Sequence, residues 1–503
     1  MKLARLFQDH MVIQRGKPFL IWGTGEEGET VTVTIGQDKQ TVRTNGGRWK
    51  IEFPPISTEK GMTITVESEN GQEVIRDVVS GEVWIAGGQS NMEFQMLFDA
   101  DHENETALCG NTDIRFFDYP EVSYEGQEED FDYSQMGYWR TCTSENLKYF
   151  SAVAYYFGKK LNRDLNVPIG IIGCNWGGTT ASCWMSEEYL RRHGQIWIDE
   201  YKRTILKIKD LEEYKNIFRK SGRNNRGQPF EDEFTMWVMP GISRKEQLKI
   251  KEDNSVAEAM ESGPFGPRRP CGLYETMLSH IAGYSVRGVI WYQGESDVLH
   301  ADIYKDVFLD LVQCWRELWK EDLPFITVQL APFEAWLDLE GTEFPMIRRQ
   351  QRRAADERGI YMVSTSDAGM RYDIHPKRKK PIGQRGALLA EEKIYGMDIL
   401  GQAPEGRRAE ESDDGIMIRF AHAGEGLILK GETLNALKVK RQDGTWAKIL
   451  SCSVEKETLR IRLDHKKTGK HVIEFAQTPY YEVNLYNSSD IPAIPFLLEV
   501  FIK

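Results

Sequence analysis

The sequence predicts an α/β protein whose central, mostly parallel sheet is flanked by two smaller β-rich units. Residues 81–403 alternate short apolar runs with helix-length stretches, the pattern of parallel strands covered by helices on both faces. Residues 1–80 and 404–503 hold short β-rich runs separated by turn residues, with no helix-length period. A chain of 503 residues is also long enough for several domains, since a domain averages roughly 150 residues. We therefore expect a β domain over 1–80, an α/β domain over 81–403 and a second β domain over 404–503.

The two terminal regions read as antiparallel sandwich-like units. In the first, strands are expected at 19–22, 30–35, 49–53 and 62–67, with turns at 23–25, 45–47 and 70–71. In the last, they are expected at 415–420, 427–430, 436–440, 459–463 and 472–475. The first unit is predicted to have a structural or substrate-shaping role rather than a catalytic one, and the second is a further small β unit.

The central region supplies five candidate strands, at 82–86, 168–174, 286–292, 325–330 and 360–365. Helices are expected at 91–99, 151–165, 304–319 and 384–395. Between about 195 and 270 lies a polar, charged segment with weak helical character, which we interpret as an insertion or lid.

Composition excludes several classes of protein. Hydrophobic residues make up 40% and charged residues 28%, and no stretch approaches the ~18 apolar residues of a membrane span. The formal net charge of −13 argues against a nucleic-acid surface. The seven cysteines form no C-x-x-C pair, which predicts reduced, mostly buried thiols. The first ten residues turn polar too early for a signal peptide, so the expected location is the cytoplasm. Monomer and homo-oligomer both remain open.

Ser90 is the candidate nucleophile. It stands in residues 87–93, Gly-Gly-Gln-Ser-Asn-Met-Glu, where the strand at 82–86 ends and a helix is expected to begin. A hydroxyl at the carboxyl end of a strand, next to helix N–H groups, suits attack on a carbonyl. The alternative is structural, because Ser90 and Glu93 match the S-x-x-E capping box that starts a helix.

His375 is the candidate base, and Asp373 is the carboxylate that would orient it. Both stand in Asp-Ile-His-Pro, residues 373–376, before the last helix of the central region. Asp367 is a second choice for the carboxylate, and a turn in which Asp373 caps the backbone is the structural alternative. If His375 is the base, activity should rise through roughly pH 6 to 7.

Donors for the tetrahedral oxyanion are expected at three strand ends. They are the N–H of Ser90, an N–H of Gly177 or Gly178, and the side chain of Gln293. Glu295 follows in Gln-Gly-Glu-Ser-Asp and would orient Gln293 or its loop.

Four motifs carry a resemblance to a known family. They are residues 87–93, Trp-Gly-Gly-Thr at 176–179, Trp-Tyr-Gln-Gly-Glu-Ser at 291–296 and Asp-Ile-His-Pro at 373–376. Together, and in this order, they resemble the sialate O-acetylesterase-like branch of the SGNH hydrolases. In the wider superfamily the aspartate stands three residues before the histidine, where this chain has Tyr372, so the fit is to the carbohydrate-directed branch.

The resemblance implies a flavodoxin-like α/β catalytic domain with β-sandwich attachments, acting without a metal or other cofactor. It implies removal of O-acetyl groups from a mono- or oligosaccharide, with Ser90, His375 and Asp373 as triad and Gly178 and Gln293 in the oxyanion hole. The predicted substrate-binding residues are Gln89, Asn91, Trp176 and Glu295, although Trp176 could equally be core. The alternatives are a non-catalytic carbohydrate-binding protein and an esterase for other acyl esters, such as those of acetylated xylan.

Overall fold

The structure is a mixed α/β protein with a large mixed sheet, which confirms the predicted fold class at that level. It is a computed structural model and describes residues 1–130, 132–220, 262–336, 339–465 and 468–502. The described residues form two compact units. The first comprises 1–220, 262–291 and 306–325, and the second comprises 292–305 and 326–502.

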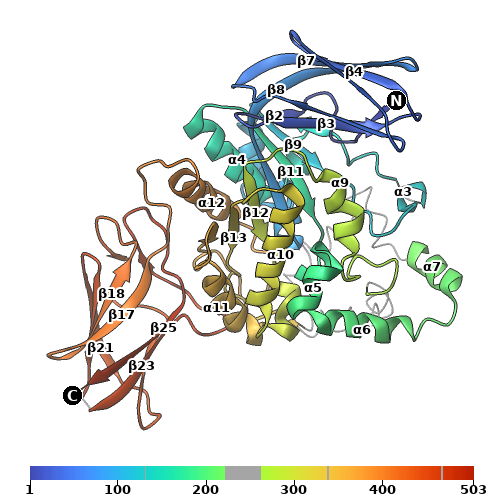
Figure 1. Ribbon diagram of the computed structural model, residues 1–503. Coiled ribbons are helices and arrows are strands. Elements are labelled where there is room, and N and C mark those ends of the chain that lie inside the picture. Colours follow the sequence, from blue (N-terminus) through green and yellow to red (C-terminus); the bar gives the residue numbers. More distant parts are fainter. Residues whose placement is uncertain (131, 221–261, 337–338, 466–467, 503) are drawn as a thin grey trace. The chain divides into compact units, whose positions relative to one another are not determined.

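The N-terminal strands of the first unit follow the predicted β pattern. They are β1 (Lys2–Leu3), β2 (Val12–Gln14), β3 (Phe19–Thr24), β4 (Thr30–Ile35), β5 (Asp38–Arg43), β6 (Arg48–Phe53), β7 (Glu59–Ser68) and β8 (Gly71–Gly88). One sheet has the order β1-β3-β6, while β4 pairs with β5 and β7 (Figure 1). Alternate residues of β3, β4 and β6 are buried, as in a strand with one face on a core.

Strand β8 joins this region to the central sheet. It pairs antiparallel with β7 over residues 71–80 and parallel with β11 (Ile169–Asn175) over residues 82–88. One strand therefore passes residue 80, where composition suggested a domain boundary. The central order in this unit is β10 (Trp139–Thr141), β9 (Ile114–Asp118), β11, β8 and β12 (Gly288–Tyr292). Strands β9 and β10 were not among the predicted ones.

Helix α4 (Ala152–Leu165) matches its prediction because the sequence supplies both ends. The hydroxyl of Ser151 accepts the N–H of Ala154 at 3.3 Å, and Asn166 ends the helix in the left-handed conformation. Further helices among the described residues of this unit are α1 (Ser90–Glu93), α2 (His102–Ala107), α3 (Gln127–Asp130), α5 (Glu187–His193), α6 (Gln195–Ile205), α7 (Leu211–Lys220), α9 (Ser279–Ile281) and most of α10 (Tyr304–Trp319). The predicted insertion at 195–270 thus begins with two helices, and its part at 221–261 lies outside the described residues.

The helix predicted over 91–99 is wrong in extent. Helix α1 covers only Ser90–Glu93, and a single 3-10 turn follows at Met96–Phe98. The backbone between them pairs with a neighbouring segment instead. The N–H of Met96 donates to Phe150, and the carbonyl of Phe94 accepts from Ala152. These long-range hydrogen bonds replace the helical ones that the apolar spacing suggested.

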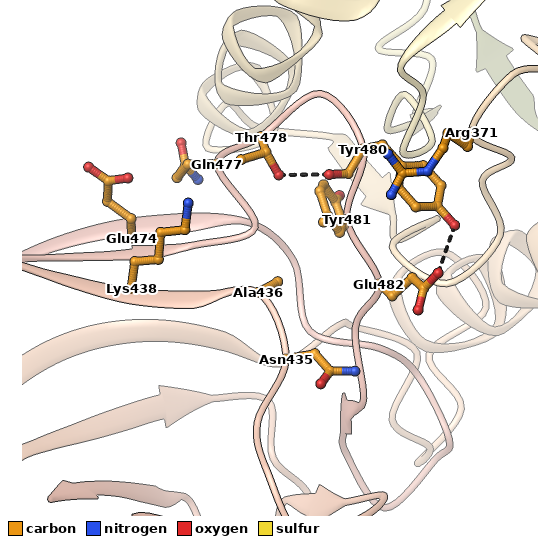
Figure 2. Close-up of a pocket in the computed structure, with 10 residues that line it drawn as sticks. All are labelled: Arg371, Asn435, Ala436, Lys438, Glu474, Gln477, Thr478, Tyr480, Tyr481 and Glu482. Atoms are coloured by element: carbon orange, nitrogen blue, oxygen red, sulfur yellow. Dashed lines mark hydrogen bonds between the residues drawn. The ribbon is translucent and has the colours of Figure 1, made fainter. Parts of the chain in front are cut away.

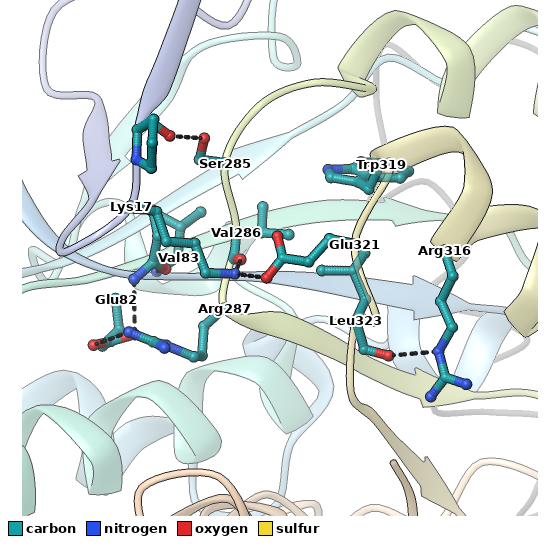
Figure 3. Close-up of polar contacts among 12 residues, drawn as sticks. Lys17, Glu82, Val83, Ser285, Val286, Arg287, Arg316, Trp319, Glu321 and Leu323 are labelled. Atoms are coloured by element: carbon teal, nitrogen blue, oxygen red, sulfur yellow. Dashed lines mark hydrogen bonds and ion pairs between the residues drawn. The ribbon is translucent and has the colours of Figure 1, made fainter. Parts of the chain in front are cut away.

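A buried carboxylate anchors β8 at the start of the part that pairs with β11 (Figure 3). Glu82 is fully buried and accepts hydrogen bonds from Arg15 at 2.6 Å, Arg287 at 2.7 Å and Gln14 at 3.0 Å. Burial raises the pKa of Glu82, but the two arginines outweigh it, so that the net shift is downward. The strand that ends at Ser90 is thereby tied to the segments on both sides of it.

The second unit contains the remaining central strands and a C-terminal β region. Its elements are β13 (Phe325–Val328), β14 (Ala335–Trp336), β15 (Leu339–Glu340), α11 (Phe344–Ala354), β16 (Ile360–Val363) and α12 (Lys380–Lys393). They are followed by β17 (Glu405–Ser412), β18 (Gly415–Ala421), β19 (Ile428–Leu429), β20 (Leu437–Arg441), β21 (Ile449–Glu455), β22 (Thr458–Leu463), β23 (Gly469–Phe475), β24 (Leu485–Tyr486) and β25 (Phe496–Ile502). The sheets β17-β18-β22-β21 and β20-β23-β25 share one apolar core. Their strands are coloured orange to red in Figure 1.

Within the described ranges, none of the helices combines the length and the apolar character that crossing a bilayer requires.

Candidate active site

Ser90 lies at a sharp turn between β8 and α1. Gly88 has a φ of +138°, a conformation that other residues rarely adopt, and Ser90 is the first residue of the helix. Its neighbours Gln89 and Asn91 are 3% and 1% exposed, whereas Ser90 is partly exposed. The turn therefore presents the serine to solvent and buries the two predicted substrate-binding residues beside it.

The capping-box alternative does not describe this turn. Gln89, not Ser90, occupies the N-cap position, and the N–H of Glu93 donates to the carbonyl of Gln89 at 3.0 Å. The carboxylate of Glu93 instead accepts the N–H of Gly177. A Cβ on Gly177 would lie 3.2 Å from the Cβ of Ser90. The turn after β11 therefore packs directly on Ser90 and leaves little room for a side chain at position 177.

This contact distinguishes between the two glycines that were candidates for the oxyanion donor. The N–H of Gly177 is used by Glu93, which leaves Gly178 as the candidate donor of this turn. Gly178 has a φ of +76°, and a Cβ on it would lie 2.9 Å from Nη2 of Arg268. Arg268 was not among the predicted site residues, because it falls in the polar segment at 195–270, for which the sequence indicates no role.

Trp176 is almost completely buried at 1% exposure. Its backbone N–H donates to the carbonyl of Gly88 at 3.2 Å, and its backbone carbonyl accepts the hydroxyl of Thr179 at 2.7 Å. These contacts fit the alternative role of Trp176 in the core and in shaping the turn.

In the second unit, Gln293 is held by a buried polar network. Its side-chain NH₂ donates to Asp297, and its side-chain oxygen accepts the hydroxyl of Tyr304 at 3.1 Å. Its backbone carbonyl accepts from Gln351 at 3.1 Å. Glu295, on the same loop, is 4% exposed. The network fixes the orientation of the Gln293 amide, as a preorganised donor requires.

His375 and Asp373 lie together in a buried loop of this unit. Nδ1 of His375 is 4.0 Å from Oδ1 of Asp373, and the same oxygen accepts the backbone N–H of His375 at 2.9 Å. The turn that was the structural alternative is therefore present, with the imidazole beside it. Lys377 pairs with the other carboxylate oxygen at 3.1 Å, a contact that the sequence reading missed.

Asp367, the second choice for the carboxylate, has other partners. Its two oxygens accept from the guanidinium of Arg385 at 2.7 and 2.8 Å, and it also accepts the hydroxyl of Tyr486 at 3.2 Å. Both oxygens are thus engaged by one arginine, which favours Asp373 as the partner of His375.

Burial and two lysines shift the pKa values of the ionisable groups in this loop. Burial, together with the charges of Lys379 and Lys377, holds the pKa of His375 well below its usual range. Burial also raises the pKa of Asp373 and lowers that of Lys377. His375 is therefore neutral at neutral pH, the state in which an imidazole can accept a proton.

We expect the acidic limb of the pH profile to lie below the range of pH 6 to 7 that an ordinary histidine would give. The neutral imidazole is the active form, so a lowered pKa extends activity toward acid. The check is kcat/KM for an acetate ester between about pH 4 and 9, compared with the ordinary histidine pKa of about 6.5. A midpoint at or above that value would contradict the lowered pKa of His375, and a rate that stays flat across the whole range would contradict its assignment as base.

A surface pocket of about 420 Å³ lies elsewhere in the second unit (Figure 2). The hydroxyl of Tyr480 donates to Glu482 at 3.1 Å, and the guanidinium of Arg371 stacks on the Tyr480 ring. None of the predicted catalytic residues is among the described residues that line this pocket.

Comparison with known proteins defines the class. Residues 265–394 match the family model described as carbohydrate esterase, sialic acid-specific acetylesterase. The fold aligns with the crystal structure of a carbohydrate acetylesterase from Xanthomonas citri, with a TM-score of 0.75, 24% identity and 99% of each chain covered. The structural match shows the fold. The family-model match and the sequence relatives class the chain as a hydrolase acting on ester bonds.

The sequence relatives are sialate O-acetylesterases. The chain is 25% identical to the one from Homo sapiens, over 99% of this chain and 92% of that protein. It is 26% identical to the one from Rattus norvegicus, over 90% and 82%. The resemblance predicted from four short motifs is therefore confirmed along nearly the whole chain.

Proposed function

We propose that this protein is a serine esterase that removes O-acetyl groups from carbohydrates, with an SGNH-type, flavodoxin-like catalytic core. The observation that carries the proposal is the turn at Ser90. A partly exposed serine ends a buried strand and contacts the glycine turn of the next parallel strand. The similarity to sialate O-acetylesterases over 99% of the chain supports an acetyl ester of a sugar as the substrate.

In the proposed reaction, the hydroxyl oxygen of Ser90 attacks the acetyl carbonyl and its proton passes to Nε2 of His375. The oxyanion is stabilised by the N–H groups of Ser90 and Gly178 and by the side chain of Gln293. Collapse breaks the ester bond, and His375 returns the proton to the departing sugar hydroxyl. Water then attacks the acetyl-enzyme while His375 takes a proton from it. The bond between the acetyl group and Oγ of Ser90 breaks, His375 returns the proton to Oγ, and acetate leaves.

The substrate is tested by measuring acetate released from O-acetylated sialic acid, from acetylated xylo-oligosaccharides and from 4-nitrophenyl acetate, with 4-nitrophenyl butyrate as comparison. The proposal predicts turnover of the acetates, preferentially of an acetylated sugar, and little of the butyrate. Preference for butyrate would indicate an esterase for other acyl groups. Glycan binding without acetate release would favour the carbohydrate-binding alternative.

Arg268 should support the reaction through its charge. Its guanidinium lies against Gly178, so it would stabilise negative charge that develops at this donor. We expect Arg268→Gln to lower kcat/KM for 4-nitrophenyl acetate by about tenfold or more. Arg269→Gln is a matched control, since the neighbouring Arg269 pairs with Glu275 at 2.6 Å. Equal losses in both variants would show that Arg268 has no specific part in the reaction.

A further inference from the structure

Two cysteines of the first unit have their sulfur atoms unusually close together. The Sγ atoms of Cys109 and Cys142 are 2.8 Å apart, with both thiols free. A disulfide bond is about 2.05 Å long, so the two sulfurs need to approach by only about 0.8 Å to form one.

Both cysteines are held by backbone hydrogen bonds. The N–H of Cys109 donates to Thr106 at the end of α2, and that of Cys142 donates to Ile114 at 2.9 Å, extending the pairing of β9 and β10. The two sulfurs are thus brought together by backbone that follows α2 and β10, and each cysteine is hydrogen-bonded to one of the flanking elements.

The two thiols differ in access and in charge. Cys142 is 1% exposed, whereas Cys109 is partly exposed. A hydrogen bond from Cys142 lowers the pKa of Cys109 in spite of its partial burial, and the N–H of Gly110 and the charge of Lys159 act in the same direction. The pKa of Cys142 is raised by the same thiol contact and by burial. Cys109 is therefore the thiol suited to react first, because the thiolate is the nucleophile.

We propose that Cys109 and Cys142 form a reversible oxidative modification site that closes to a disulfide with a small-molecule disulfide, such as glutathione disulfide, as oxidant. The thiolate of Cys109 attacks one sulfur of the oxidant, breaking its S–S bond and releasing one thiol. The thiolate of Cys142 then attacks Sγ of Cys109 and releases the second. In balance, two protein thiols are oxidised and one small disulfide is reduced to two thiols. This site is independent of the proposed esterase activity.

Closure would join the end of α2 to the end of β10. The segment from Ser90 to Cys109 is already tied to α4, because Tyr156 donates to Asp99 at 2.8 Å and Tyr155 donates to Glu105 at 3.0 Å. The disulfide would add a covalent anchor where this segment ends, and would stabilise the fold mainly by restricting the unfolded chain.

The test uses the whole 503-residue chain, first reduced and then incubated with increasing glutathione disulfide. Remaining thiols are alkylated, and the unreduced digest is analysed by mass spectrometry. We expect a Cys109–Cys142 linked peptide that dithiothreitol removes, while the partly exposed Cys452 stays alkylated over the same range. We also expect the oxidised protein to melt a few degrees higher than the reduced one.

The variants test the order of attack. In Cys142→Ser, Cys109 should accumulate as its mixed disulfide with glutathione, and the shift in melting temperature should vanish. In Cys109→Ser, the buried Cys142 should stay unmodified. Several results would overturn the proposal: wild-type protein with both cysteines alkylated at the highest oxidant concentration, Cys109 held only as a mixed disulfide, or a link to a different cysteine.

Discussion

Ser90→Ala should abolish turnover of acetate esters, lowering kcat/KM by about a thousandfold or more. The substitution removes the nucleophile but leaves the backbone N–H groups of the turn in place, so the residual rate would report transition-state stabilisation alone. Because Ser90 is partly exposed, losing its hydroxyl should leave the folded structure unchanged. The readout is steady-state kinetics with 4-nitrophenyl acetate, with circular dichroism to establish folding.

A matched serine controls for the loss of a hydroxyl. Ser285 lies in the same unit and donates its hydroxyl to the carbonyl of Pro18 at 2.7 Å. Ser285→Ala should retain wild-type kcat/KM. If Ser90→Ala keeps its activity while remaining folded, Ser90 is not the nucleophile.

Glu82→Gln should produce the largest loss of stability among the single substitutions considered. It preserves the volume of the side chain but leaves Arg15 and Arg287 facing each other without a negative charge. Removing one partner of a buried ion pair costs about 3–5 kcal/mol. The arginine side chains are 30% and 27% exposed, which places the expected loss of unfolding free energy near 3 kcal/mol.

The control is Glu321→Gln, which breaks the pair with Lys17 shown in the same view (Figure 3). Glu321 is 40% exposed, so this loss should stay below about 1 kcal/mol. Denaturant unfolding at neutral pH measures both variants. The folded pKa of Glu82 lies below its ordinary value of 4.5, so its contribution is present above that pH and is lost as pH falls through the folded pKa. The difference between wild type and Glu82→Gln should therefore shrink in acid, and a difference that grew there would contradict the assigned charge.

Sequence reasoning succeeded where local signals agreed with tertiary packing. Ser151 and Asn166 mark the ends of α4, and α10 spans the predicted residues 304–319. Helix α12 starts at Lys380, four residues before its predicted start at 384, because Pro381 suits a first turn.

The predictions failed where hydrogen bonds to backbone far away in the sequence determine the local structure. The apolar spacing after Ser90 suggested a helix to residue 99, but hydrogen bonds to residues 150–152 end it at Glu93. Strands β9 and β10 and helix α11 were also missed. Helix α11 buries the polar side chains of Arg348, Gln350 and Gln351, so its sequence lacks the apolar spacing that would predict a packed helix.

For the site, the motifs indicated which residues to examine but not how they are satisfied. No pattern in the sequence indicated that Glu93 accepts the N–H of Gly177, that Lys377 pairs with Asp373, or that Arg268 contacts Gly178. Such contacts join residues far apart in the chain or depend on side-chain direction, which one sequence does not encode visibly. The roles of Ser90, His375 and Asp373, and the cytoplasmic location, stay predictions.

The most direct test of the central claim is to trap the covalent intermediate. Wild-type protein is mixed with 4-nitrophenyl acetate, quenched in acid within the first turnovers and digested for mass spectrometry, with Ser90→Ala in parallel. We predict a gain of one acetyl group on the peptide containing Ser90, absent from Ser90→Ala and lost as the substrate is consumed. Turnover by the wild type with Ser90 unmodified, together with undiminished turnover by Ser90→Ala, would contradict the proposed mechanism.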